Sequence, residues 1–179
     1  NADLREGVAK VLQADRTLDS LVPVGVAEHA TSFELGGRVK LPKLSGDRII
    51  LTLGYNPTAP GHADLANLQR SRIEGLDGVS VRLVTSGVAD LWLTDTPAWV
   101  NTAGGWLQYY LDSPLPNSRT KLESLDQRAR TTTGVARTVA ITELQQQAAV
   151  DNTVLPVSQG EGILFVGKGV TLIGQPFGS

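Results

Sequence analysis

Histidine is scarce in this sequence of 179 residues, and its two copies are His29 and His62. Asp64 follows His62 at a spacing that suits a metal pair or a general base with its orienting carboxylate. Asp64 also has the position of a helix cap, which explains it without catalysis. His29 has no motif around it, so we expect it in a core or an interface. A hydrolase using His62 with Asp64 or Asp90 is kept as a third functional hypothesis.

Other catalytic or metal-binding patterns are not found. Asp90, Asp95 and Asp112 lie near expected strand ends, where paired carboxylates could do acid–base work, but turns also place aspartate there. The sequence has no cysteine, which excludes thiolate metal sites and cysteine nucleophiles. Two histidines with scattered carboxylates do not form a zinc pattern, and no Gly-x-Ser-x-Gly elbow is present. We therefore expect no enzymatic activity, no metal and no cofactor.

Two basic features could bind phosphate. Lys168 lies between two glycines, but Val170 follows where a phosphate-binding loop needs a hydroxyl, so a hairpin tip explains this segment better. Between 117 and 137, basic residues outnumber acidic ones and threonines 131–133 follow, a composition that suits phosphate contacts of DNA. A solvated helix face or a charged subunit contact is the preferred explanation of that stretch. Its basic residues are Arg119, Lys121, Arg128, Arg130 and Arg137.

Aromatic residues gather in one stretch. Tryptophans recur every seven residues at Trp92, Trp99 and Trp106, and Tyr109 and Tyr110 follow. Such side chains build cores, and they are also enriched in binding and subunit interfaces. The segment 94–105 around Trp99 is polar and turn-rich. A tryptophan in such a loop is expected to pack on a core or a partner and not to face solvent. The interface candidates are Trp92, Trp99, Trp106, Tyr109, Tyr110, Arg119, Arg128, Arg130 and Lys168.

Composition is that of a folded globular protein, with 41% hydrophobic and 19% charged residues. The formal net charge of −2 gives no general attraction to nucleic acid or anionic membrane. No apolar run approaches the roughly 20 residues of a membrane span, so we expect a soluble chain. The sequence begins with Asn1, which indicates either processing of a secreted precursor or a trimmed start.

The first half of the sequence contains clear periodic segments. Leu4, Val8, Val11 and Leu12 form one stripe of an amphipathic helix that ends near residue 21. Alternating side chains over 33–54, around the turn at 45–47, predict antiparallel strands. A second helix begins at Asp64 and stops at Gly78, and a strand follows over 79–83.

Further elements are expected along the rest of the chain. Residues 88–94, 105–111 and 135–142 are strand candidates, 119–130 is a short helix, 143–150 is ambiguous, and 163–173 is a hairpin. The predicted fold class is α+β, a mainly antiparallel β-sheet with two or three short packing helices and a C-terminal β-hairpin. The proline-rich break near 114–118 suggests a core domain over 1–116 and an extension or arm over 117–179. One continuous domain is the alternative.

Residues 3–22 resemble the opening of bacteriophage tail-terminator and tail-completion proteins. The shared features are an amphipathic helix, the Ala14-Asp15 pair and the Leu18-x-x-Leu21-Val22 stop. The resemblance implies a ring-forming virion component at the head–tail junction or tail, without enzymatic activity.

We therefore predict a non-enzymatic structural protein of a phage virion that self-assembles into a homo-oligomeric ring or shell with other virion proteins. The alternative is a secreted β-rich binding module that uses the Trp99 loop to hold a glycan or peptide.

Overall fold

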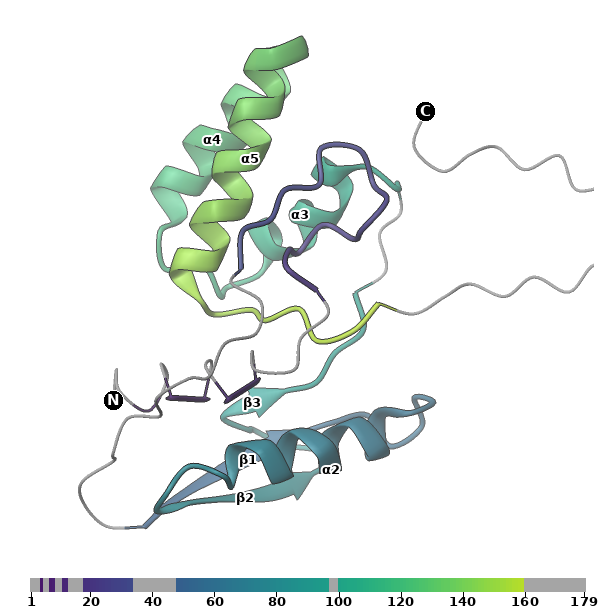
Figure 1. Ribbon diagram of the computed structural model, residues 1–179, viewed down its shortest axis with the longest axis vertical. Helices are drawn as coiled ribbons and strands as arrows, with labels where there is room; N and C mark the ends of the chain where they lie inside the picture. Colours follow the sequence, from purple (N-terminus) through teal and green to yellow (C-terminus); the bar gives the residue numbers. More distant parts are fainter. Residues whose placement is uncertain are drawn as a thin grey trace, which may run out of the picture. The chain divides into compact units, whose positions relative to one another are not determined.

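The structure is a computed structural model that describes residues 4, 7, 8, 11, 12, 18–33, 48–96 and 100–159. The chain divides into two compact units (Figure 1). Unit 1 comprises Asn1–Arg16 and Leu35–Thr96, and unit 2 comprises Thr17–Glu34 and Pro97–Ser179. Residues on both sides of the boundary predicted after residue 116 therefore belong to unit 2.

Unit 1 is built on a small parallel sheet. Its strands are β1 (Ile49–Gly54), β2 (Val79–Val84) and β3 (Leu91–Trp92), in the order β2-β1-β3. Ile49 lies opposite Val79, and Leu53 lies opposite Leu91. Parallel neighbours need a crossover connection, which helix α2 (His62–Ile73) supplies between β1 and β2. The strand predicted at 79–83 is confirmed. A helix also forms where one was predicted, but its N-cap is Gly61 and not Asp64, and it ends at Ile73 and not at Gly78.

The prediction of a mainly antiparallel sheet is wrong, because β1 pairs in parallel with both β2 and β3. The alternation of Ile49, Leu51 and Leu53 does mark a strand. Alternation shows which side chains share a face, and it does not contain the direction of the partner strand. The expected first arm of the hairpin and its turn at 45–47 lie outside the described residues, as does the hairpin at 163–173.

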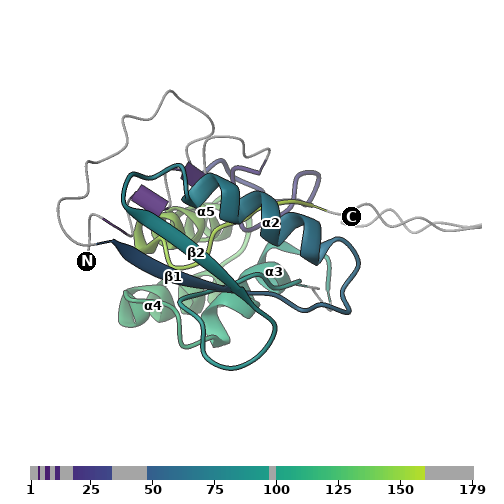
Figure 2. The same ribbon diagram turned by 90° about the horizontal axis from the view of Figure 1, so that it is seen from below.

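One face of the sheet is covered by helices. Leu53, Val79 and Val81 are buried together with Ile73 of α2, and Figure 2 shows α2 running along the sheet. The stripe predicted near the N-terminus packs here too, since all four of its positions are helical and belong to this core: Leu4, Val8, Val11 and Leu12. On the other face, Ile50 is 66% exposed. Among the described residues of unit 1, the helices therefore cover one face of the sheet, the face against which α2 packs.

Unit 2 is helical. Its helices are α3 (Ala103–Asp112), α4 (Arg119–Thr131) and α5 (Gly134–Asp151), and the segment 18–33 packs against them. The short connection after α4 makes α4 and α5 a helical hairpin, which lie side by side in Figure 1. The predicted helix at 119–130 is confirmed. No helix in the described ranges is long and apolar enough to cross a bilayer.

The strands predicted at 105–111 and 135–142 are wrong, because both segments are helical. In α3, the Thr102 hydroxyl accepts a hydrogen bond from the Gly105 amide at 3.2 Å and so caps the helix. Ala103, Leu107 and Tyr110 then fall on one buried face at helical spacing. In α5, Ala140, Ile141, Leu144 and Ala148 do the same. Besides the helical positions near the N-terminus, the described residues form four helices with defined bounds, α2 to α5, which is more helix than the predicted two or three.

Candidate functional site

The order of the strands in unit 1 points to one edge of the sheet. From β1 the chain crosses to β2 on one side, and it then returns to β3 on the other side of β1. In parallel α/β sheets, ligands bind beyond the carboxyl ends of the strands, at the point where such connections diverge. Here that point lies between β1 and β3. We call it the carboxyl edge, formed by Gly54, Trp92, His62 and Asp95.

The indole of Trp92 is the largest exposed group of the carboxyl edge. Trp92 is opposite Gly54 in the register, and its ring lies against the Gly54 backbone. A Cβ at position 54 would stand 2.6 Å from three ring carbons. Glycine is therefore what permits the ring to lie flat there, with Trp92 remaining 45% exposed.

The backbone of β3 is a free edge within the described residues. The Leu93 amide donates to the Gly54 carbonyl at 2.8 Å. Alternate residues of a parallel strand face the same neighbour, so the backbone groups of Trp92 point away from β1. At the other edge, Glu74 Oε1 accepts a hydrogen bond from the Val81 amide at 2.9 Å. That contact closes part of β2 to an additional strand.

His62 and Asp95 meet at the same edge. His62 is the first residue of α2, and its Nε2 lies 3.0 Å from Asp95 Oδ1. The two side chains differ in exposure, 7% for His62 and 77% for Asp95. The Nδ1 atom of His62 is buried and has no hydrogen-bond partner among the described residues. Asp64, the partner considered from sequence, lies in the first turn of α2.

Asp90 has a separate task beside this edge. Its Oδ2 accepts hydrogen bonds from the Thr52 hydroxyl at 2.7 Å and the Thr52 amide at 2.8 Å. These bonds lower the pKa of the Asp90 carboxyl, the hydroxyl having the larger effect. Asp90 thus ties the segment before β3 to β1. Within the described ranges, no group of three histidine, aspartate or glutamate residues is placed to hold a metal ion.

The aromatic candidates belong to different units and differ in burial. Trp92 belongs to unit 1, and Trp106 belongs to unit 2, where it packs against the core and its Nε1 donates to Asn101 at 2.9 Å. Tyr110 is buried, and its hydroxyl donates to Asp151 at 3.1 Å. Burial raises the pKa of Tyr110 to about 12. Tyr109 is 51% exposed, and Trp99 lies outside the described residues.

The arginines predicted as interface residues have partners inside unit 2. Arg128 pairs with Glu143, and Arg130 donates to Asp126 Oδ2 at 2.7 Å. Hydrogen bonding to Asp126 raises the pKa of Arg130. These pairs neutralise much of the positive charge that suggested phosphate contacts. Lys168 lies outside the described part of the chain.

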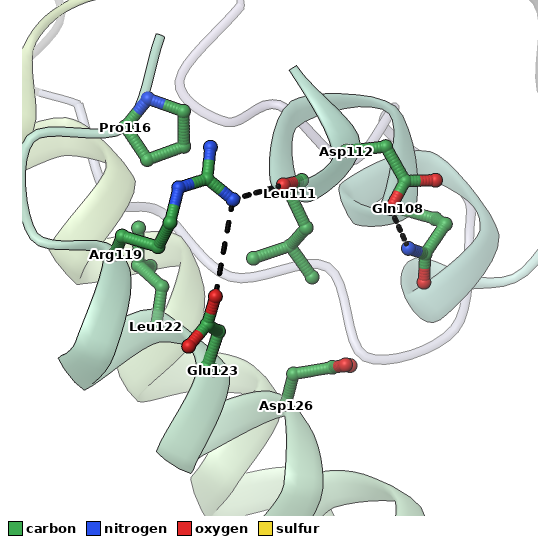
Figure 3. Close-up of a pocket in the computed structure, with 8 residues that line it drawn as sticks. All are labelled: Gln108, Leu111, Asp112, Pro116, Arg119, Leu122, Glu123 and Asp126. Carbon is green, nitrogen blue, oxygen red and sulfur yellow. Dashed lines mark hydrogen bonds and ion pairs between the residues drawn. The ribbon is translucent and has the colours of Figure 1, made fainter. Parts of the chain in front are cut away.

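Arg119 lines a hollow of about 160 Å³ between α3 and α4, drawn in Figure 3. It donates to the Leu111 carbonyl at 3.1 Å and also to the Ser113 carbonyl. Basic side chains commonly satisfy the last carbonyls of a helix in this way. Asp112, Glu123 and Asp126 are further lining residues. The role of Arg119 is therefore to close the end of α3.

By sequence, the chain matches no family model and no curated protein. Solved structures do resemble it. One is a peptide-binding protein of a peptide ABC transporter, with a TM-score of 0.62, 14% identity, and coverage of 88% of this chain and 90% of that one. Another is the ABC transporter substrate-binding protein CtaP from Listeria monocytogenes, with a TM-score of 0.59 and 18% identity. The match covers 88% of this chain and 40% of that chain.

A third is the crystal structure of AppA from Clostridium difficile, described as a peptide-binding protein, with a TM-score of 0.58 and 14% identity. It covers 86% of this chain and 39% of that chain. This chain therefore spans nearly all of the first neighbour and well under half of the other two. At these identities, the likeness shows a shared fold.

The predicted role as a ring-forming phage virion component is wrong. The solved structures that resemble this chain are peptide- and substrate-binding proteins of ABC transporters. The prediction depended on the helix pattern of residues 3–22, on an expected strand-rich chain, and on clustered aromatic residues without site chemistry. An amphipathic helix occurs in many folds, and the sheet is parallel. The alternative of a binding module agrees better with the fold.

Proposed function

We propose that this chain is the ligand-binding part of a non-enzymatic protein that captures peptides outside the cytoplasm for an ABC transporter. The fold likeness to peptide- and substrate-binding proteins supports this proposal. The observation that carries it is the carboxyl edge, where an exposed indole, a free strand edge and an exposed carboxylate occur within a few residues. Membrane subunits of the transporter would be the partner, and homo-oligomer formation stays a prediction.

Each feature of the edge matches a part of a peptide. The outward backbone groups of Trp92 can pair with an extended peptide, as strand addition does in other recognition domains. The indole offers a flat apolar surface to a peptide side chain. Asp95, three residues further on, offers an acceptor to an ammonium group or an amide. Three residues span at most about 10 Å, so one short peptide reaches both groups.

Among the aromatic interface candidates identified from sequence, Trp92 lies at this edge. The sequence alternative relied on Trp99, which lies outside the described residues. The proposal therefore concerns Trp92, at which β3 ends, and Asp95, three residues further along the chain.

Calorimetric titration of the 179-residue chain with trialanine and Ala-Phe-Ala tests the proposal. We expect Trp92→Ala to weaken binding about ten-fold or more, the size typical of an interface anchor. Tyr109→Ala is the matched control, because it removes another half-exposed aromatic ring, from α3 of unit 2, and it should leave the affinity unchanged. Absence of peptide binding by the unchanged chain, or equal losses in both variants, would contradict the proposal.

A further inference from the structure

His62 has a burial that its own contacts do not explain. The side chain is 7% exposed, yet Nδ1 has no hydrogen-bond partner among the described residues. Burying such a nitrogen without a partner costs free energy that a leucine of similar size would avoid. Polar groups that break this rule in a folded protein are expected at functional positions. The imidazole Nε2 lies 3.0 Å from the exposed carboxylate of Asp95.

The geometry assigns the roles of the two ring nitrogens. An ionised carboxylate only accepts hydrogen bonds, so Nε2 carries the proton and donates to Asp95 Oδ1. In the neutral imidazole, Nδ1 is then an acceptor. Because α2 begins at His62 and its ring is enclosed in unit 1, the donor is held by rigid structure. Asp95, at 77% exposure, has no comparable packing of its own.

We propose that His62 is a positioning residue for Asp95. It holds Oδ1 from the buried side and leaves Oδ2 free to accept a hydrogen bond from the ligand. An exposed aspartate that is free to rotate loses side-chain entropy when it binds, and fixing it beforehand removes part of that cost. The inference rests on the proposed function, because it assigns Asp95 a ligand. It adds the residue that prepares this contact.

The first measurement needs no ligand. Three-bond NMR couplings of the Asp95 β-protons should show one side-chain rotamer in the unchanged chain and averaging in His62→Leu. Nitrogen shifts of His62 should show the proton on Nε2. Averaged couplings in the unchanged chain, or a proton found on Nδ1 alone, would overturn the inference. Because no peptide is present, this result is independent of whether the proposed function holds.

The second measurement is calorimetric titration with trialanine. We expect His62→Leu to weaken binding about five-fold, the net contribution of one hydrogen bond. His62→Gln restores a donor and should recover most of the affinity. In the Asp95→Ala background, which removes the acceptor of His62, His62→Leu should have little further effect. A full effect of His62→Leu in that background, or no recovery by glutamine, would mean that the histidine acts on the fold in general.

The matched control is the other histidine. His29 also lies beside a carboxylate, with its Nε2 3.1 Å from Asp19 Oδ1, but in unit 2. His29→Leu should leave trialanine affinity and the Asp95 couplings unchanged. An equal loss of affinity in His29→Leu would overturn the inference. Failure of the unchanged chain to bind any peptide would contradict the proposed function, while the couplings would still decide whether His62 orients Asp95.

Discussion

The ring of Trp92 lies where the side chain of its register partner would be if that partner were not Gly54. A Cβ added to Gly54 would be 2.6 Å from the ring carbons, well inside the 3.5–4.0 Å of an ordinary carbon contact. The glycine and the tryptophan are therefore one structural feature, although they lie in different strands.

We expect Gly54→Ala to displace the indole. The free energy of unfolding should fall by about 1–2 kcal/mol, a typical cost of inserting a carbon into a packed contact. Of the indole N–H signals in a two-dimensional NMR spectrum, that of Trp92 should move most. In a Trp92→Val background the same change should be neutral or stabilising, because glycine weakens a strand interior. An equal loss in both backgrounds would contradict the proposed contact.

Adjacent glycines of α3 should respond in opposite ways to alanine. At Gly105 a Cβ would meet the Val100 carbonyl oxygen at 2.2 Å, whereas at Gly104 the nearest atom is Arg137 Nη2 at 3.9 Å. Gly104→Ala should stabilise the protein by about 0.5–1 kcal/mol through helix propensity. Gly105→Ala should destabilise it by about 1–3 kcal/mol, because backbone must shift. Urea unfolding of both variants checks this contrast, and equal effects would show that the start of α3 is placed differently.

Gln145 attaches the segment 18–33 to α5. This fully buried amide accepts hydrogen bonds from the Ser20 hydroxyl at 2.7 Å and the Ala30 amide at 3.0 Å, and it donates to the Glu28 carbonyl at 2.8 Å. Glu28 has a positive φ of 64°, a conformation that non-glycine residues adopt only at a cost.

Gln145→Leu should destabilise the protein by about 3 kcal/mol, because it leaves several buried polar groups without partners. Amide hydrogen exchange at Ala30 should accelerate together with this loss. Gln146→Leu is the matched control, since Gln146 is the next residue of α5 and is exposed. It should change stability by less than about 0.5 kcal/mol. If the two variants behaved alike, Gln145 would not be the attachment.

Asp151 connects the end of α5 to the start of α4. Its carboxylate accepts hydrogen bonds from the Ser118 hydroxyl at 2.6 Å and the Ser118 amide at 3.0 Å, and from Gln147 at 3.0 Å. Burial alone would raise the pKa of Asp151, but these hydrogen bonds outweigh it and the pKa is lowered. The ionised form is therefore the one that stabilises the fold.

Asp151→Asn should lower the free energy of unfolding by about 1–3 kcal/mol at pH 7, because the new amide donor faces the existing donors. The folded-state pKa is the lower one, so the contribution of Asp151 is complete above the unfolded value of about 3.9 and is lost as the pH falls through the folded value. The difference between the unchanged chain and the variant should therefore shrink below about pH 4. Urea unfolding from pH 7 to pH 3 measures it, and Asp112→Asn, at an exposed position, should show no such difference. A difference in free energy of unfolding between the unchanged chain and Asp151→Asn that stays constant from pH 7 to pH 3 would contradict the prediction.

Several elements could be predicted from the sequence because their information is local. The stripe of Leu4, Val8, Val11 and Leu12 repeats at helical spacing, and these side chains do pack together in unit 1. The helix at 119–130 and the strand at 79–83 have equally regular patterns. Local periodicity selects the face that is buried, and burial of that face is what the fold preserves.

Segment 105–111 shows where local pattern was insufficient. Its apolar run of Leu107, Tyr110 and Leu111 fits a helix as well as a strand, because a short apolar run does not distinguish the two. The hydroxyl cap from Thr102 and the buried core of unit 2 select the helix. Neither is visible as a period in the sequence.

The sequence by itself determined the absence of cysteine chemistry, the helical stripes and the positions of the aromatic and histidine residues. Only the tertiary structure decided that β1 pairs in parallel with β2 and β3, that Gly54 receives the ring of Trp92, and that His62 meets Asp95. The physical reason is that each of these contacts joins residues far apart along the chain. Their meeting depends on strand order and register, which arise from packing of the whole sheet. Asp64 is nearer to His62 in sequence, but the fold brings Asp95 to the imidazole.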